Sequence, residues 1–197
     1  MSTPVMPEGA APPARRWSRR GAGLAALGLA MLSAAAPAWS QKPLARALTP
    51  LESRFLDAAA RNGLAEIAAA QLALGKARTT AVRAFAQQMA DDHAVVHREL
   101  ASLATARSHA LPRTPDAAQQ ARIEQLAPLE PHAFERRYVE TMGVQAHHAS
   151  VALFEEVERG TQDRDIQEFA ARTLLDLRRH LELSRTLYET LARQDGR

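Results

Sequence analysis

Residues 80–103 read TAVRAFAQQMADDHAVVHRELASL, and this stretch decides the fold. Its apolar residues recur at alternating spacings of three and four, which is the period of one face of an α-helix. The face consists of Val82, Phe85, Met89, Val96, Leu100 and Leu103, with His93 in its middle. The stretch therefore predicts an amphipathic helix that begins after Thr79 or Thr80 and carries a histidine on its buried side.

Three further segments show the same helical period. The first opens at Thr49-Pro50-Leu51-Glu52, where an N-cap Thr, a Pro at the first helical position and a Glu form a capping box, and it runs to about Lys76. The next begins near His132 and ends near Gly160, the predicted C-terminal cap, and the last runs from after Asp163 to about Ala192. The predicted inward faces are Leu56, Ala59, Gly63, Ile67, Ala70 and Leu74 in the first, Phe134, Tyr138, Val144, His147, Val151 and Phe154 in the next, and Ile166, Phe169, Thr173, Leu177, His180, Ser184, Leu187 and Leu191 in the last.

The longest connection is predicted between the second and third of these long helices. Residues 108–116 contain Pro112 and Pro115, and a short helix is expected from about Ala117 to Leu126. No segment shows the alternation of a β-strand. The sequence therefore predicts an all-α fold, an up-and-down, ferritin-like four-helix bundle with a short extra helix before the third long helix.

The first forty residues predict a secretory signal peptide. A cluster of four arginines precedes an apolar run over residues 21–36, and Ala38-Trp39-Ser40 fits a signal-peptidase site. Cleavage near Ser40/Gln41 would give a periplasmic or secreted protein, by either the general or the twin-arginine route. The predicted organisation is a signal peptide over 1–40, a flexible segment over 41–48, the bundle over 49–193 and a tail over 194–197. No apolar run in the mature chain reaches the roughly 20 residues of a transmembrane helix.

Charge and composition exclude several classes of function. The net charge of +3 belongs to the leader, because residues 41–197 contain 21 basic and 21 acidic side chains. A near-neutral mature chain with 5% aromatic residues lacks the basic surface and stacking platforms of a nucleic-acid-binding protein. The absence of cysteine excludes disulfides, thiolate metal sites and a thiol nucleophile. A homo-oligomer is compatible with the sequence, which identifies no partner.

Several motifs resemble the bacterial family called domain of unknown function 4142, whose members are exported proteins with a ferritin-like helical bundle. The motifs cover most of the mature chain, and they are FLDAAA (55–60) with GLAE (63–66), VRAFAQQM (82–89) followed by DDH (91–93), His147 with VALFE (151–155), and TL (173–174) followed by HL (180–181). The resemblance implies the fold and an exported location, and it implies no established activity.

One polar residue from each long helix falls near the middle of that helix. These residues are Glu66, His93, His147 and His180, and antiparallel packing would bring them into one layer of the bundle. His147 and His148 point about 100° apart, so at most one of them faces the core. Asp92 and Asp176 lie where either can hold the ring of a layer histidine.

Two interpretations of this layer follow. Three imidazoles and a carboxylate form a ligand set for a divalent transition metal, with Cu or Zn as the candidates. Alternatively, the histidines are hydrogen-bonded core residues that fix the register of the helices and bind nothing. The pair His93 and His97, spaced i, i+4, can also hold an ion on a helix surface.

The sequence predicts a non-enzymatic binding or envelope protein. No histidine has an acidic residue three positions before it, so the Glu-x-x-His motif of di-iron bundles is absent. No phosphate-binding loop, nucleophile elbow or H-E-x-x-H motif is present either.

Overall fold

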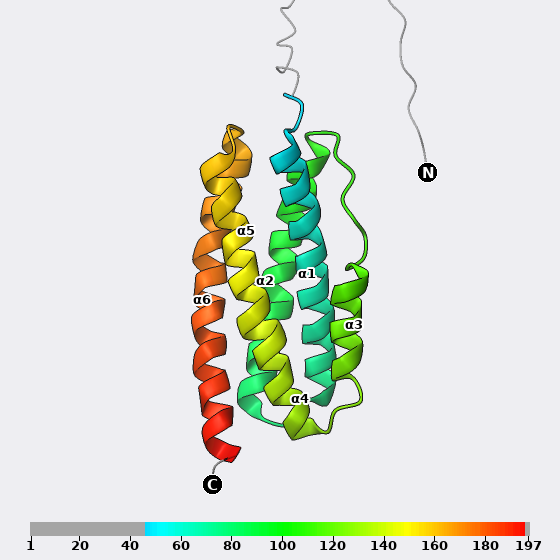
Figure 1. The fold of residues 1–197 in the computed structure, drawn as a ribbon, viewed down its shortest axis with the longest axis vertical. Helices are drawn as coiled ribbons and strands as arrows, with labels where there is room; N and C mark the ends of the chain where they lie inside the picture. The colour runs from blue at the N-terminus through cyan, green and yellow to red at the C-terminus, as the bar shows by residue number, and fades with distance from the viewer. Residues whose placement is uncertain (1–45, 196–197) are drawn as a thin grey trace, which may run out of the picture. The chain divides into compact units, whose positions relative to one another are not determined.

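Four long helical rods make up the fold in the computed structural model, which describes residues 46–195 (Figure 1). The rods are α1 (Pro50–Lys76), α2 (Thr80–Thr105), a third rod in which α4 (Pro131–Tyr138), the π-helix η1 (Val139–Gln145) and α5 (Ala146–Gly160) follow without a break, and α6 (Arg164–Asp195). The described residues contain no strand, and the predicted all-α class is confirmed. The predicted signal peptide lies outside the described residues.

The rods pack as a four-membered bundle in which α1 contacts α2 and α5, and α6 contacts α5 and α2. α2 and the third rod run in the same direction, as Figure 1 shows. The connection between them must therefore return along the bundle, so the predicted up-and-down order does not hold for these two rods. It contains α3 (Ala117–Leu126), which packs beside α1 and has the predicted bounds.

Side-chain caps start the first two helices as the sequence predicts. Thr49 Oγ1 accepts a hydrogen bond from the Glu52 amide at 3.3 Å, and the Thr49 amide donates to Glu52 Oε2 at 2.7 Å. Thr79 Oγ1 accepts from the Val82 amide at 3.3 Å, so α2 begins at Thr80. These bonds satisfy amide groups that the first turn of a helix leaves unpaired.

Two apolar clusters fill the two halves of the bundle. One includes Phe85, Met89, Phe134, Tyr138 and Met142, and the other includes Phe55, Leu56, Leu100, Phe154 and Phe169. In every rod, the residues of one cluster are separated from those of the other by the middle of the rod, where the predicted polar layer lies. Apolar packing therefore stabilises the bundle on both sides of the layer.

The π-helix changes the inward face that the sequence predicts for the third rod. Val139 and Met142 are buried, whereas Val144, predicted inward, is only half-buried. A π-turn closes with an i to i+5 hydrogen bond, here from the Ala146 amide to the Thr141 carbonyl, so it adds a residue to the turn. The apolar pattern before the π-helix is consequently out of register with the pattern after it.

Further details differ from the sequence expectation. Gly160 is the last residue of α5, and Thr161, with extended backbone (φ −81°, ψ 146°), is the C-cap. The predicted glycine cap is therefore wrong. A Cβ at Gly160 would lie 2.8 Å from Leu51 Cδ2, the end of a flexible side chain that would have to move. α6 continues past Ala192 to Asp195. Of the predicted face of α1, Ile67 and Leu74 are only half-buried.

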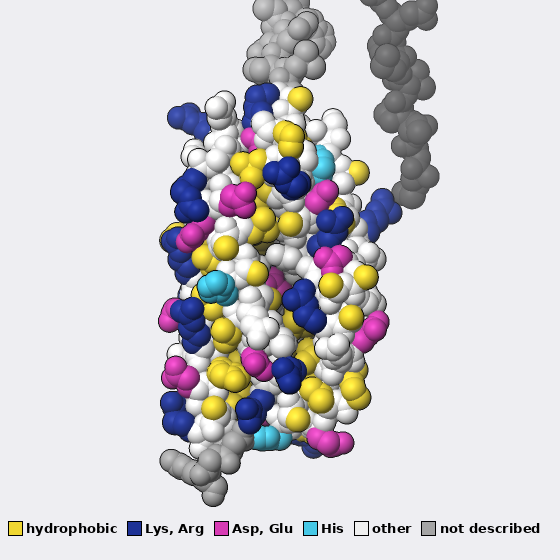
Figure 2. Space-filling view, in the orientation of Figure 1, with side chains coloured by type: hydrophobic (Ala, Val, Ile, Leu, Met, Phe, Trp, Pro, Cys, Tyr) yellow, Lys and Arg dark blue, Asp and Glu magenta, His cyan; other side chains and the backbone are white. Residues whose placement is uncertain are grey.

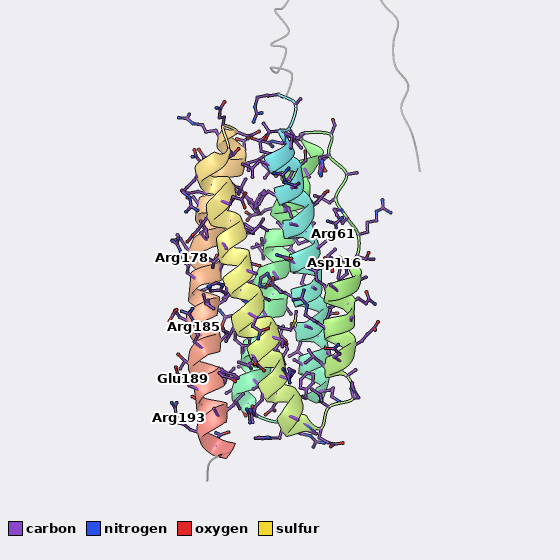
Figure 3. All side chains as sticks on the ribbon, viewed as in Figure 1. Arg61, Asp116, Arg178, Arg185, Glu189 and Arg193 are labelled. Atoms are coloured by element: carbon purple, nitrogen blue, oxygen red, sulfur yellow. The ribbon has the colours of Figure 1, made fainter. Side chains whose placement is uncertain are left out.

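The surface carries charges of both signs. Figure 2 shows one face, on which basic and acidic side chains are interspersed. Three labelled side chains of α6 in Figure 3 (Arg185, Glu189 and Arg193) project away from the other rods, whereas Arg178 contacts Glu155 of α5 at 2.8 Å. Within residues 46–195, no helix combines the length and apolar character needed to cross a membrane.

Candidate metal centre

The four predicted residues meet in one buried layer between the apolar clusters. Glu66, His93, His147 and His180 come from α1, α2, α5 and α6, and their exposed fractions are 5%, 4%, 0% and 2%. The three imidazole centroids lie 5.3, 5.6 and 5.4 Å from one another. His148 is exposed, so the adjacent His147 is the one that faces the core.

The π-helix fixes the ring of His147. Its Nδ1 lies 2.9 Å from the carbonyl oxygen of Gly143 and 3.1 Å from that of Met142. Carbonyl oxygens only accept hydrogen bonds, so Nδ1 carries the proton of the neutral ring and Nε2 carries a lone pair. That Nε2 faces the Nε2 of His93 at 3.2 Å.

A carboxylate fixes the ring of His180. Its Nε2 donates to Asp92 Oδ2 at 2.9 Å, and the same oxygen also accepts from Gln88 at 3.3 Å. The lone pair of His180 is therefore on Nδ1, which is buried and has no hydrogen-bond partner. Asp92 is thus placed as the sequence predicts, while Asp176 pairs with Arg179 at 3.1 Å.

Glu66 lies on the outer side of His93. Its Oε2 is 3.0 Å from His93 Nδ1, and its Oε1 is 4.0 Å from His147 Nδ1 and has no hydrogen-bond partner. The glutamate therefore orients the His93 ring, whose other nitrogen faces His147. The sequence predicts Glu66 as a metal ligand, and in this geometry it contacts the nitrogen of His93 that points away from the other two rings.

The three histidines have the arrangement of a metal ligand set. Each offers one ring nitrogen, and these atoms lie within 4.8 Å of one another. Two nitrogens bound to a tetrahedral zinc ion at 2.0–2.1 Å are about 3.3 Å apart. The His93 and His147 nitrogens, at 3.2 Å, already have this spacing. In each ring the other nitrogen contacts an oxygen of the protein, as is usual for histidines that bind metals.

Burial keeps the layer uncharged. It lowers the pKa of His93 well below its ordinary value, with a further contribution from His147 and His180, and it lowers the pKa of His147 to about 4. The pKa of His180 is lowered by the same cause, although Asp92 opposes the effect. Burial raises the pKa of Glu66 to about 8. Neutral imidazole is the form that binds transition metals.

The close pair of Nε2 atoms permits two states. If Glu66 is protonated and donates to His93 Nδ1, then His93 Nε2 carries a proton and donates to His147. If Glu66 is ionised and accepts from His93 Nδ1, two lone pairs face each other at 3.2 Å and attract a cation. The layer can thus exchange a proton for a metal ion.

The sequence identified the histidines, Glu66 and Asp92 but missed the backbone oxygens that hold His147. Nothing in the apolar pattern marks the π-turn whose carbonyls orient His147. His97, which the sequence pairs with His93, is not one of the three clustered histidines. Its Nδ1 is buried near Gly63 of α1.

Comparisons with known proteins identify a family and a fold. A family model described as "Domain of unknown function (DUF4142)" matches residues 37–187. A solved structure, the crystal structure of a DUF305 fragment from Deinococcus radiodurans, is similar with a TM-score of 0.64 and 16% identity, over 75% of this chain and 99% of that one. At this identity the likeness concerns the fold alone. No curated protein matches the chain.

Proposed function

We propose, from the premise that this chain belongs to the family of domain of unknown function 4142, that it is an exported protein that binds one divalent transition-metal ion between His93, His147 and His180. The role is binding, for sequestration or delivery, rather than catalysis. Support for export comes from the arginine cluster, apolar run and cleavage site within residues 1–40.

One observation carries the proposal of metal binding. In His147 and His180 the outer nitrogen donates to an oxygen, which leaves the inner nitrogen with a lone pair and without a proton. Among residues 46–195, the inner nitrogen of His180 has no hydrogen-bond partner. Buried polar atoms in folded proteins are nearly always paired, so an unpartnered nitrogen beside two further imidazoles is the feature of a ligand set.

The donor set limits the metal. Three neutral imidazoles without a thiolate suit Zn²⁺, Cu²⁺, Ni²⁺ or Fe²⁺, whereas Ca²⁺ and Mg²⁺ prefer oxygen ligands. We place Zn²⁺ and Cu²⁺ first. With three protein ligands, the fourth position of a tetrahedral ion would be filled by water or another small ligand.

The competing function is a purely structural polar layer. It is supported by the first of the two states above, in which a protonated Glu66 satisfies His93 without a metal. A polar layer of this kind fixes helix register at a cost in stability. The two functions differ in whether an added ion stabilises the fold.

The test is metal analysis and thermal unfolding of the protein purified without a histidine tag. We expect about one ion per chain and a rise in melting temperature with added Zn²⁺ or Cu²⁺, because an ion that binds only the folded state stabilises it. His93→Ala with His180→Ala should abolish the rise, and His148→Ala, which removes an exposed neighbour of His147, should leave it intact. A shift that survives the double replacement would refute the site.

A further inference from the structure

A cleft leads from the surface to the outer side of the layer. It lies between α1, α3 and the η1–α5 part of the third rod, and it has a volume of about 70 Å³. Its lining includes Asn62, Gln119, Arg122 and Met142, with Glu66 from the layer itself. A space of this size with polar walls holds ordered water.

α3 forms one wall of this cleft, and a hydrogen bond joins it to α1. Gln119 Nε2 donates to Asn62 Oδ1 at 2.7 Å, and Gln119 is itself fixed by the capping box with Asp116. Figure 3 labels Asp116 at the start of α3, beside α1. On the opposite wall Ala146 and Ala149 present only methyl groups, so small side chains keep the cleft open.

Glu66 is the one acidic side chain that lines the cleft. Its Oε2 contacts His93, while its buried Oε1 has no hydrogen-bond partner among the described residues. Because Glu66 lines the cleft, its carboxyl group, with one oxygen unpaired among the described residues, can bind a hard or borderline cation.

The other carboxylate of the centre is less able to receive an ion. Asp92, on the α2–α6 side, already accepts hydrogen bonds from His180 and Gln88 and lies 3.5 Å from Arg179. A cation that approached there would have to displace a guanidinium group and an amide. The α2–α6 side therefore holds the ring of His180, and the cleft is the open side.

We propose that the cleft between α1, α3 and α5 is the entrance through which a divalent metal ion reaches the three-histidine centre, with Glu66 as the first ligand that the ion meets. The inference rests on the proposed function. It assigns Glu66 a role in the rate of loading as well as in the orientation of His93, and it assigns Arg122 a role in slowing cations at the entrance.

The first test closes the entrance with a bulky side chain. Ala149 is exposed and lines the cleft, whereas Ala152, one turn further along α5, is exposed and does not line it. Zn²⁺ association and dissociation are measured in stopped flow with a fluorescent zinc indicator. We expect Ala149→Phe to slow both by roughly tenfold or more, because entry then requires a local opening of the bundle. Ala152→Phe should load at the rate of the unmodified protein.

The second test changes the charge at the entrance without filling it. Arg122→Gln should speed Zn²⁺ association about twofold at low ionic strength, and salt should remove the difference. Arg98→Gln on α2, which does not line the cleft, makes the same change in net charge and should have no such effect. This arm is independent of whether Ala149→Phe folds.

The outcomes separate the two proposals. Unchanged equilibrium affinity with slower loading of Ala149→Phe supports the entrance. If the unmodified protein binds Zn²⁺ and Ala149→Phe loads at the same rate, or if Arg122→Gln and Arg98→Gln behave alike, the entrance is wrong while the metal centre stands. If the unmodified protein binds no metal, both proposals fail.

Discussion

Two buried glutamates on α1 have opposite surroundings. Glu52, at the start of the helix, accepts hydrogen bonds from the Thr161 hydroxyl at 2.6 Å, the Arg46 guanidinium at 2.6 Å and the Thr49 amide at 2.7 Å. Burial alone would raise its pKa, but these donors lower it to about 2. Glu66, in the middle, contacts one imidazole, and burial raises its pKa to about 8.

The difference separates a structural carboxylate from a functional one. Glu52 ties the start of α1 to the turn between α5 and α6, and its oxygens are fully used by the fold. Glu66 has an oxygen that the fold leaves unused. A protein keeps a buried polar atom unpaired at some cost in stability, so such an atom is evidence for a ligand or a proton that occupies it.

The same substitution at both glutamates should give the largest contrast. Glu52→Gln places an amide among three donors, so we expect a loss of about 3 kcal/mol in the free energy of unfolding at pH 7. Glu66→Gln replaces a carboxyl group that is largely neutral at this pH, and the metal-free variant should stay within about 1 kcal/mol of the parent. Urea denaturation followed by circular dichroism measures both. Equal losses would contradict the distinction.

Stabilisation by metal should depend on Glu66 in the central layer and should not depend on Glu52 at the start of α1. At a free Zn²⁺ concentration one hundred times the dissociation constant, the parent should gain about 2.7 kcal/mol. Glu52→Gln should gain the same free energy of unfolding from Zn²⁺, although its metal-free form is less stable than the parent. Glu66→Gln should bind about 10–100-fold more weakly, because the ring of His93 then has a neutral amide in place of a carboxylate acceptor. Isothermal titration calorimetry gives the affinities. If Zn²⁺ did not stabilise Glu52→Gln, the assignment of Glu52 to a purely structural role would be contradicted.

Gly143 tests how the π-helix supports the layer. A Cβ at this position would lie 2.8 Å from Ser184 Cβ, so Gly143→Ala should displace the carbonyls that hold His147 and cost about 1–3 kcal/mol. The double variant Gly143→Ala, Ser184→Gly should recover part of the lost stability and part of the lost affinity for Zn²⁺. If Gly143→Ala binds Zn²⁺ like the parent, the π-turn does not orient the ligand.

The pH dependence of stability should carry the smallest effect. Glu66 has a raised pKa, so the metal-free folded state holds a proton that the unfolded state has released, and stability falls as pH rises toward 8. The three buried histidines have lowered pKa values, which make stability rise over the same range in the parent and in Glu66→Gln alike. Between pH 6.5 and 8 the stability of the parent relative to Glu66→Gln should therefore fall by about 1–2 kcal/mol. Glu52 has a lowered pKa, so its contribution is present above pH 4.5 and is lost as pH falls toward 2. A constant difference in stability between the parent and Glu66→Gln above pH 6.5 would contradict the neutral state of Glu66.

The sequence predicts the helices and the histidines well because both follow from local patterns. Thr49, Pro50 and Glu52 are a capping signal that tertiary packing does not override, and α1 begins where they predict. The seam of α2 is buried around His93 as its period indicates. Midpoints of helices of similar length coincide in a bundle, which is why the layer could be predicted.

The parts that could not be predicted depend on contacts between rods. A π-turn leaves no signal in apolar spacing, so the pattern predicted Val144 as buried although it is only half-buried, and the choice between His147 and His148 stayed open. The single hydrogen bond of Glu66 and the unpartnered Nδ1 of His180 depend on where α1 and α6 lie relative to α2. Only the packed bundle determines which ring nitrogens face one another.

The central claim is that three imidazoles bind one metal ion, and X-ray absorption of the Zn²⁺-loaded, untagged protein tests it most directly. The account predicts three nitrogen ligands at about 2.0–2.1 Å with the outer-shell pattern of imidazole. It also predicts that this pattern disappears in His93→Ala with His180→Ala and persists in His148→Ala. A spectrum dominated by oxygen ligands, or one that the double replacement leaves unchanged, would contradict it.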